Sequence, residues 1–328
     1  MQYGPVIDFL SRHGKFVITA HETPDGDALG SEFAMQRALA KLGKDSFICN
    51  ADPAPEKFSF VEPENQPLVL QNGAQLPSDL AERALIILDV NDLNNLGSVG
   101  RLVVPRVQEY LIIDHHDSDA DLLASNHIEQ GASSTCEILY LLFRAMRVEV
   151  DFFMAQALYM GIIYDTGCFI YPKTTAVTFQ IAHELVGLGV SPNEIYASVY
   201  ESNSLSSLVL MSRVLSTLTL HEGGRVAVQS ITRRMLEETG ARYEEGDHLI
   251  NIPLRSREVV VSIYFKENLE GVRRCSIRSK GEIDVAEIAQ DYGGGGHRTA
   301  AGFKCARPFE ELQGEILDRL EAKYFTAR

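Results

Sequence analysis

Residues 16–31, FVITAHETPDGDALGS, join a short apolar stretch to a loop rich in Pro, Gly and Asp. The stretch 16–20 predicts a buried strand, and the spacing of apolar residues over 31–43 predicts a helix after the loop. Ligands of open α/β sheets bind at the carboxyl ends of strands, so this loop is a candidate site. A plain turn with a helix N-cap is the alternative. The loop offers three candidate metal ligands, His21, Asp25 and Asp27.

Strands and helices continue to alternate after this first unit. The strand-like segments are 46–49, 84–88 and 110–113, and the helical ones are 133–147, 152–164 and 175–189. This order predicts an α/β fold with a doubly wound, mostly parallel sheet. Beyond residue 214 strand-forming residues dominate, with strands at 214–220, 225–231, 258–265 and 272–278 and helices at 284–291 and 308–324. We therefore predict a metal-binding domain at 1–190, a helical linker at 191–213 and a smaller α/β domain at 214–328.

Length and charge agree with a division into two domains. The chain has 328 residues, 45% of them hydrophobic, and a formal charge of −15. Residues 1–210 hold 12 Lys/Arg and 27 Asp/Glu, whereas residues 211–328 hold 18 of each. An acidic first part can bind cations, and a neutral second part can bind an anionic ligand. The alternative is that the acidic surface only promotes solubility. A pI near 5.1 argues against coating of duplex nucleic acid.

The cysteines and the apolar runs bear on the compartment. Five scattered Cys form neither a C-x-x-C pair nor a disulfide framework, which predicts a reducing compartment. The apolar runs are too short to span a bilayer, and the N-terminus lacks the features of a signal peptide. The sequence therefore predicts a cytoplasmic protein without a membrane partner.

Further acidic and imidazole residues follow the other apolar segments. Asp89 directly follows the strand 84–88, and Asp92 competes with it for the same role. The triplet Asp114-His115-His116 follows the strand 110–113. Adjacent His side chains point in different directions in an extended chain, so one can ligate a metal while the other faces a substrate and the Asp orients a ring. Two surface His are the alternative reading.

Together with Asp165, which ends an apolar helical run, these positions form a candidate metal site. The six candidate ligands are His21, Asp25, Asp27, Asp89, His115 and Asp165. Oxygen-rich ligation with some imidazole suits Mn²⁺ or Mg²⁺ better than structural Zn²⁺. Four carboxylates repel one another without metal and balance two divalent cations. We therefore predict two cations, Mn²⁺ or Mg²⁺, about 3.5–4 Å apart.

A run of glycines marks a second candidate site. Gly293 to Gly296 precede His297, and their peptide N–H groups can approach an anion closely. A flexible linker is the alternative. The segment 276–280, SIRSK, ends a predicted strand with groups suited to phosphate, or forms an ordinary solvated strand end. The predicted substrate-binding residues are Arg278, Ser279, Gly294, Gly295, Gly296 and His297.

These motifs resemble those of the DHH phosphoesterase family. HETPDGDALGS resembles its first motif, Asp89 its second, Asp114-His115-His116 its third and Asp165 its fourth. GGGGHRTAAGF resembles the signature of the DHH-associated C-terminal domain, subfamily one. The initial His and the compact length resemble the nanoRNase branch, the bifunctional oligoribonucleases and pAp phosphatases. The stretch LDVNDLNNLG departs from the second motif, where relatives often have a smaller or more polar residue after the Asp.

The resemblance implies a role for each site residue. One cation would be bound by His21, Asp25 and Asp89, and the second by Asp27, Asp89, His115 and Asp165. Asp89 would bridge the two cations, His116 would face the scissile phosphate and Asp114 would support them, which makes these three the predicted catalytic residues. An activated water would attack the phosphorus, while the C-terminal domain holds the far end of the substrate.

The implied activity is exonucleolytic hydrolysis of short oligoribonucleotides of about two to five nucleotides, together with 3′-phosphoadenosine 5′-phosphate (pAp). The implied partners are thus short single-stranded RNA or nucleotides, and the sequence leaves a homodimer open. A phosphodiesterase acting on cyclic di-AMP or pApA is the first alternative. A nucleotide-binding module without catalysis is the second.

Overall fold

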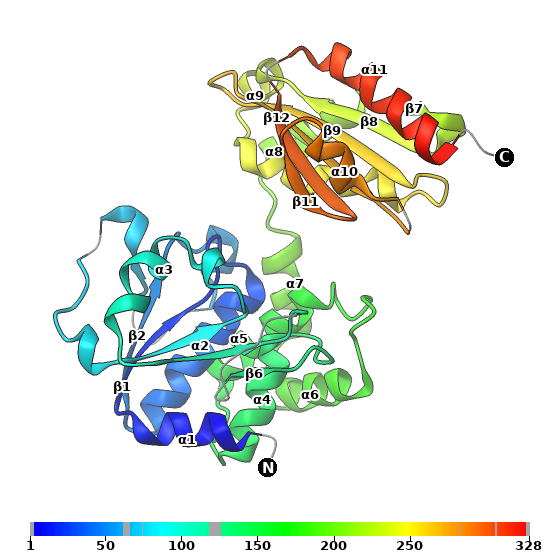
Figure 1. Cartoon of the computed structure of the whole chain (residues 1–328). Coiled ribbons are helices and arrows are strands. Elements are labelled where there is room, and N and C mark those ends of the chain that lie inside the picture. The colour runs from blue at the N-terminus through cyan, green and yellow to red at the C-terminus, as the bar shows by residue number, and fades with distance from the viewer. Residues whose placement is uncertain are drawn as a thin grey trace. The chain divides into compact units, whose positions relative to one another are not determined.

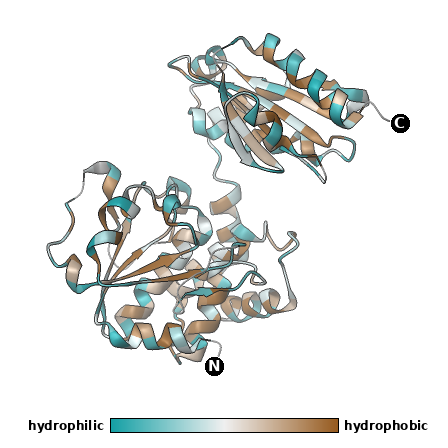
Figure 2. Cartoon of the chain, in the orientation of Figure 1, coloured by the Kyte–Doolittle hydropathy of each residue, from teal (hydrophilic) through white to brown (hydrophobic). Residues whose placement is uncertain are grey.

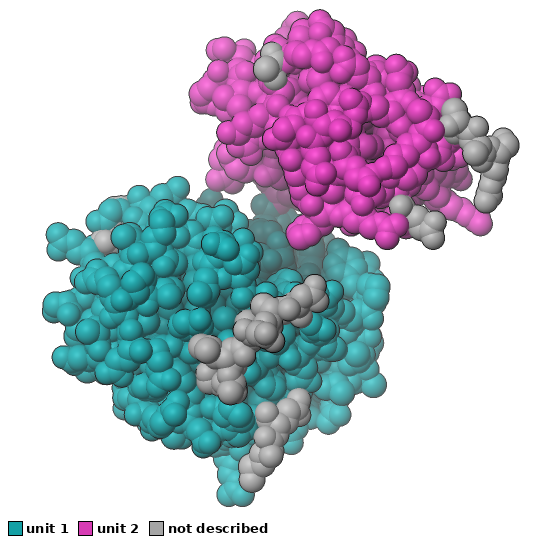
Figure 3. All heavy atoms as spheres, in the orientation of Figure 1, with its two compact units in different colours: residues 1–202 teal, residues 203–328 magenta. Residues whose placement is uncertain are grey.

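The chain folds into two compact units. The computed structural model describes residues 3–61, 66–73, 75–117, 126–281, 283–305 and 307–325. The units are Met1–Ser202 and Asn203–Arg328 (Figures 1 and 3), each with a sheet and an apolar core. The predicted linker contains α7 (Pro192–Tyr200) in the first unit and α8 (Leu205–Leu215) in the second. The functional boundaries at residues 190 and 214 stay predictions.

The sheet of the first unit is parallel throughout its described strands. Its order is β3-β2-β1-β4-β5-β6, with β1 (Lys15–Thr19), β2 (Asp45–Asn50), β3 (Leu68–Val69), β4 (Ala84–Leu88), β5 (Tyr110–Asp114) and β6 (His127–Ile128). The chain winds one way from β1 to β3 and the other way from β4 to β6. The point between β1 and β4 is therefore the topological switch point, where doubly wound folds bind their ligands. The predicted fold class is confirmed.

Apolar side chains cover both faces of this sheet, and Figure 2 shows its central strands as largely hydrophobic. In β1, Phe16 and Ile18 enter one core while Val17 enters the other, as the alternation of a strand requires. The first core includes residues of α1 (Gly4–Arg12), α2 (Gly26–Lys41), α4 (Thr135–Ala145), α5 (Phe152–Asp165) and α6 (Ala176–Gly187), and the second those of α3 (Ser98–Leu102). No described helix is long and apolar enough to cross a membrane.

Helix α2 begins five residues earlier than the apolar spacing predicts. The carboxylate of Asp25 caps it by accepting hydrogen bonds from the N–H groups of Asp27 (3.0 Å) and Ala28 (3.2 Å). The second half of the first motif is therefore helical. Close packing of α2 on α5 requires glycine at two positions, because a Cβ at Gly30 would overlap the backbone of α5 and one at Gly161 would overlap Asp27.

The second unit contains a mixed sheet. Its order is β11-β12-β10-β9-β8-β7, with β7 (Thr219–His221), β8 (Val226–Ile231), β9 (Val261–Glu267), β10 (Arg273–Ser279), β11 (Gly295–His297) and β12 (Ala300–Cys305). Strands β8 and β9 are parallel and the other described pairs antiparallel. Residues of α10 (Val285–Gln290) and α11 (Phe309–Leu320) join one core, and those of α8 and α9 (Arg233–Thr239) another.

Two parts of the second unit differ from the sequence prediction. The strand predicted at 214–220 is mostly absent, because Leu210 and Val214 are buried on one face of α8, which continues to Leu215. The glycine run, for which no strand was predicted, contributes Gly295 and Gly296 to β11 (Gly295–His297), an edge strand paired with β12. Strand β12 alternates the apolar residues Ala301, Phe303 and Cys305 with Gly302 and Lys304, but β11 is three residues long and has no apolar side chain, so the pattern does not reveal a hairpin.

Candidate metal centre

The predicted ligands gather at the carboxyl ends of three adjacent strands. His21 and Asp25 lie in the loop after β1, and Asp89 directly follows β4. Asp114 ends β5, so His115 and His116 leave the sheet at the same edge. Asp27 and Asp165 come from helices, the first from the start of α2 and the second from the end of α5.

These side chains form three overlapping groups in which the ligand atoms lie within 4.8 Å of one another. The groups are His21, Asp25 and Asp89; Asp27, His115 and Asp165; and Asp89, Asp114, His115 and His116. All six predicted ligands are included. Asp92 is in none of these groups; it is exposed, and its carboxylate accepts the N–H of Asn94 (2.9 Å). The geometry thus favours Asp89 over Asp92, while the ligand roles stay predictions.

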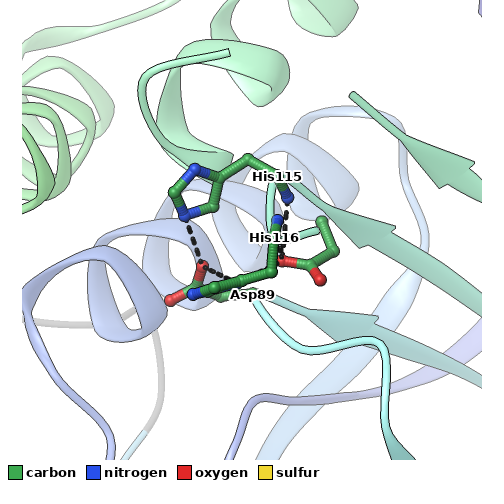
Figure 4. A group of neighbouring side chains, drawn as sticks. Asp89, His115 and His116 are labelled. Atoms are coloured by element: carbon green, nitrogen blue, oxygen red, sulfur yellow. Dashed lines mark hydrogen bonds and ion pairs between the residues drawn. The ribbon is translucent and has the colours of Figure 1, made fainter. Parts of the chain in front are cut away.

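Asp89 belongs to two of the three groups, and Figure 4 shows it beside His115 and His116. Its Oδ2 lies 3.7 Å from His21 Nε2, and its Oδ1 lies 3.5 Å from His115 Nε2. The two oxygens of one carboxylate therefore face two different groups, as a bridging ligand requires. The backbone of Asp89 is left-handed, with φ +61°, and its N–H donates to Ile113 O (3.0 Å). Such strain in a non-glycine residue is typical of functional sites.

Asp114 organises the two histidines. Its Oδ1 accepts hydrogen bonds from His116 Nδ1 (2.8 Å) and from the backbone N–H groups of His115 (2.8 Å) and His116 (3.2 Å). Its Oδ2 accepts from Asn91 Nδ2 (2.7 Å). Burial is the largest influence and opposes ionisation, but the hydrogen bond and charge of His116, together with the backbone N–H groups of His115 and His116, outweigh it and lower the pKa of Asp114. The same bond raises the pKa of His116, whose side chain is 54% exposed.

The buried carboxylates lie close enough to repel one another. Burial, followed by the negative charge of neighbouring carboxylates, raises the pKa values of Asp27 and Asp89 well above the ordinary value, and that of Asp25 is raised as well. Among the described residues, neither ring nitrogen of His115 has a hydrogen-bond partner, although Nε2 lies 2.9 Å from Asp165 Oδ2. Orphaned imidazole nitrogens beside repelling carboxylates form a donor set that fits divalent cations.

Other residues that the sequence did not single out surround this cluster. The ammonium of Lys57 lies 4.7 Å from the ring centre of Phe58 and 5.2 Å from that of Tyr164. Burial lowers the pKa of Lys57, and the charge of Asp25 opposes that shift. Lys173 donates to the carbonyl of His115 (2.9 Å). Isolated lysines have no diagnostic spacing, so no sequence signal distinguished them.

Glu32 is a further buried acid, in α2. It is fully buried and accepts a hydrogen bond from Asn50 Nδ2 (2.9 Å), and burial raises its pKa to about 8. In an unfolded chain a Glu ionises near pH 4.3. Between about pH 4.3 and about pH 8 the unfolded state therefore releases this proton first, and stability falls as pH rises.

We expect Glu32→Gln to reduce the loss of stability that accompanies rising pH. The variant should show a shallower dependence of unfolding free energy on pH than the parent, measured by urea denaturation at several pH values with EDTA present. Equal slopes over this range would show that Glu32 is already ionised in the folded protein.

The predicted substrate residues lie in the second unit and differ in their surroundings. Among the described residues, the half-buried Arg278 has no ion-pair or hydrogen-bond partner, and burial lowers its pKa. The hydroxyl of Ser279 donates to Ile283 O (2.7 Å). His297 is exposed on β11. Arg278 lies on β10, which β12 separates from the edge strand β11, and a guanidinium without a partner among the described residues has donors available to an anion.

Packing requires glycine at some positions of this run and not at others. A Cβ at Gly294 would overlap the backbone and side chain of residues 302–303, and one at Gly296 would overlap residues 300–301, whereas Gly295 has open space. A cavity of about 490 Å³ is lined by Arg274, Ser276, Gly293, Gly294 and Lys304, among others. Of the predicted substrate residues, only Gly294 lines it.

Fold and site together define a two-part α/β protein with a carboxylate–imidazole centre at the switch point of its first sheet. Family models agree with this division: residues 15–162 match the DHH family, N-terminal domain, and residues 223–324 match the DHHA1 domain.

Relatives with known names cover most of the chain. The bifunctional oligoribonuclease and PAP phosphatase NrnA of Thermus thermophilus is 32% identical over 88% of this chain and 83% of its own length. The protein of the same name from Bacillus subtilis is 28% identical over 90% of this chain and 91% of its own length. This chain belongs to the DHH family. The resemblance seen in the motifs is confirmed, as is the predicted class of enzyme, a metal-dependent hydrolase.

A solved structure extends the likeness to both units. The exopolyphosphatase-related protein from Bacteroides fragilis superposes with a TM-score of 0.88 at 25% identity, covering 98% of this chain and 96% of that one. The two-part architecture is therefore shared over nearly the whole length of both proteins.

Proposed function

We propose that this chain hydrolyses short oligoribonucleotides from one end and also hydrolyses pAp. The observation that carries the proposal is the cluster around Asp89, in which one carboxylate faces two groups of candidate ligands. The names of the relatives from Thermus thermophilus and Bacillus subtilis support this choice of substrates. The free state of all five cysteines supports a cytoplasmic location.

The cluster would hold two divalent cations, with Mn²⁺ favoured and Mg²⁺ the alternative. His21, Asp25 and Asp89 would form one set and Asp27, Asp89, His115 and Asp165 the other. When bound, such cations polarise a phosphoryl oxygen and acidify water. No side-chain nucleophile is then required.

His116 would contact the phosphate. Its Nδ1 is held by Asp114, which leaves Nε2 of a half-exposed ring available as a donor. The raised pKa of His116 favours the protonated ring, and a protonated ring stabilises charge that develops on a phosphoryl oxygen. Asp114 fixes the orientation of this ring and does not touch the substrate itself.

The second unit would bind the far end of the substrate. Arg278 supplies a guanidinium that has no partner among the described residues, and β11, with Gly295 and His297, supplies an open edge. A few such contacts suit short substrates, because long polymers are held by many phosphate contacts.

We expect Arg278→Ala to raise KM by roughly 10- to 100-fold, as the loss of one charge-assisted hydrogen bond requires. Metal content should remain that of the parent, and kcat should change less than KM. Steady-state kinetics on pAp with metal analysis of the same sample test this. Arg257→Ala, which removes an equal charge from an exposed position, is the matched control. Loss of metal from the Arg278 variant would contradict the division of roles.

A substrate panel tests the proposed activity directly. Purified protein with Mn²⁺ is offered pAp, short RNA, pApA and cyclic di-AMP. Turnover of pAp and short RNA is expected. Preferential turnover of cyclic di-AMP or pApA would replace the proposal by the cyclic-dinucleotide alternative, and binding without turnover would identify a nucleotide-binding module.

A further inference from the structure

The first turn of α4 contacts two of the candidate ligands. The N–H of Thr135 donates to Asp27 Oδ2 (2.6 Å), and the N–H of Cys136 donates to Asp27 Oδ1 (3.0 Å). The hydroxyl of Thr135 donates to Asp89 Oδ1 (3.0 Å). Thr135 is completely buried. Two carboxylates, one from α2 and one from the end of β4, therefore meet at one helix end.

The two carboxylates are held in different ways. Asp27 receives backbone N–H groups at the positive end of α4, so the side chain at position 135 does not determine these bonds. Asp89 accepts a hydrogen bond from the side-chain hydroxyl of Thr135, so this bond depends on the residue at position 135. A substitution at Thr135 can thus alter the support of one ligand and leave that of the other in place.

The hydroxyl also acts on a specific oxygen. Oδ1 of Asp89 faces His115 Nε2 at 3.5 Å, whereas Oδ2 faces His21 Nε2 at 3.7 Å. The left-handed backbone of Asp89 sets the direction in which its side chain leaves the main chain, and the Thr135 hydroxyl fixes the orientation of its carboxylate. The bond therefore sets how the carboxylate is turned between the two groups.

We propose that Thr135 is a positioning residue, which holds the Asp89 carboxylate turned with one oxygen toward each group of ligands so that two divalent cations bind without rearrangement. The inference rests on the proposed function in one respect, that the cluster binds cations. Because the hydroxyl contacts Oδ1, its loss affects first the cation on the side of Asp27, His115 and Asp165. The cation on the side of His21 and Asp25 is affected less.

The test compares Thr135→Val, which keeps the shape and removes the hydroxyl, with Thr135→Ser, which keeps the hydroxyl. Mn²⁺ is titrated calorimetrically into each metal-free protein. In Thr135→Val we expect affinity for the second equivalent to fall by roughly 10- to 100-fold, with the first nearly unchanged. Thr135→Ser should bind both equivalents nearly as the parent does. Thr178→Val is the matched control, since Thr178 is equally buried and its hydroxyl donates to Glu137 (2.7 Å).

Each other outcome overturns the inference. Normal binding of two Mn²⁺ by Thr135→Val would show that the hydroxyl is not needed, while the proposed function would stand. Equal weakness of the Ser and Val variants would show that any change at this buried position weakens binding, so the hydroxyl would not be the cause. If Thr135→Val does not fold, Thr135→Ala is compared with Thr135→Ser instead, because these two variants again differ by the hydroxyl. Absence of Mn²⁺ binding by the parent would overturn the proposed function as well.

Discussion

Replacement of Asp89 by Asn is expected to lower kcat by roughly 10³-fold or more, the largest single effect in the protein. The carboxylate of Asp89 faces both groups of ligands, so its loss weakens the binding of two cations at once. An amide keeps the shape but cannot supply two anionic oxygens. Mn²⁺-dependent hydrolysis of bis-p-nitrophenyl phosphate measures the activity, and metal analysis of the same sample counts bound cations.

The neighbouring Asp92 provides the matched control for this variant. Asp92→Asn makes the same chemical change three positions away, on an exposed residue whose carboxylate accepts the N–H of Asn94. Near-parental activity is expected there. Full activity in Asp89→Asn, or a loss confined to Asp92→Asn, would overturn the assignment of the bridging carboxylate.

The second large effect is a pH-dependent stabilisation by divalent cations. The pKa values of Asp25, Asp27 and Asp89 are raised in the folded protein by burial and mutual repulsion. Above about pH 4 the unfolded chain therefore releases these protons before the folded chain does, and the metal-free protein loses stability as pH rises. Cations replace the protons, so they should stabilise more at about pH 8 than at about pH 5.

Thermal unfolding with excess Mn²⁺ and with EDTA measures this difference. We expect Mn²⁺ to raise Tm at about pH 8 by on the order of 10 °C, as for a few kcal/mol in a domain of this size, and by much less at about pH 5. Asp89→Asn should lose most of the Mn²⁺ effect at the higher pH. An equal rise at both pH values would show that the carboxylates are ionised throughout, contrary to their burial.

The sequence revealed the candidate ligands because each follows a segment with a clear pattern. Asp89 and the triplet after β5 come directly after short apolar strands, and parallel strands end at one edge of the sheet. Strand order could not be read in this way, although the adjacency of β1, β4 and β5 is what brings these residues close together. The residue type and the position at the strand end indicated only which edge of the sheet they occupy.

The supporting residues could not be found by such reasoning. Thr135 matters because the first turn of α4 lies against α2 and the end of β4, and only the folded chain shows that contact. Asn91 contacts Asp114 across 23 positions of sequence, without a spacing that identifies the pair. The glycine run was recognised by composition, but two of its members are required by the packing of a hairpin, which composition does not reveal.

The double use of Asp25 has an evolutionary consequence. Its carboxylate both caps α2 and belongs to one group of candidate ligands, so a substitution by a residue that cannot cap the helix loses about 0.5–2 kcal/mol together with a candidate metal ligand. A homologue that loses catalysis through such a substitution would therefore also lose part of its stability. A stable homologue without catalytic activity should carry Ser, Thr or Asn at this position, because these residues retain the helix cap but lack the carboxylate that would bind the cation.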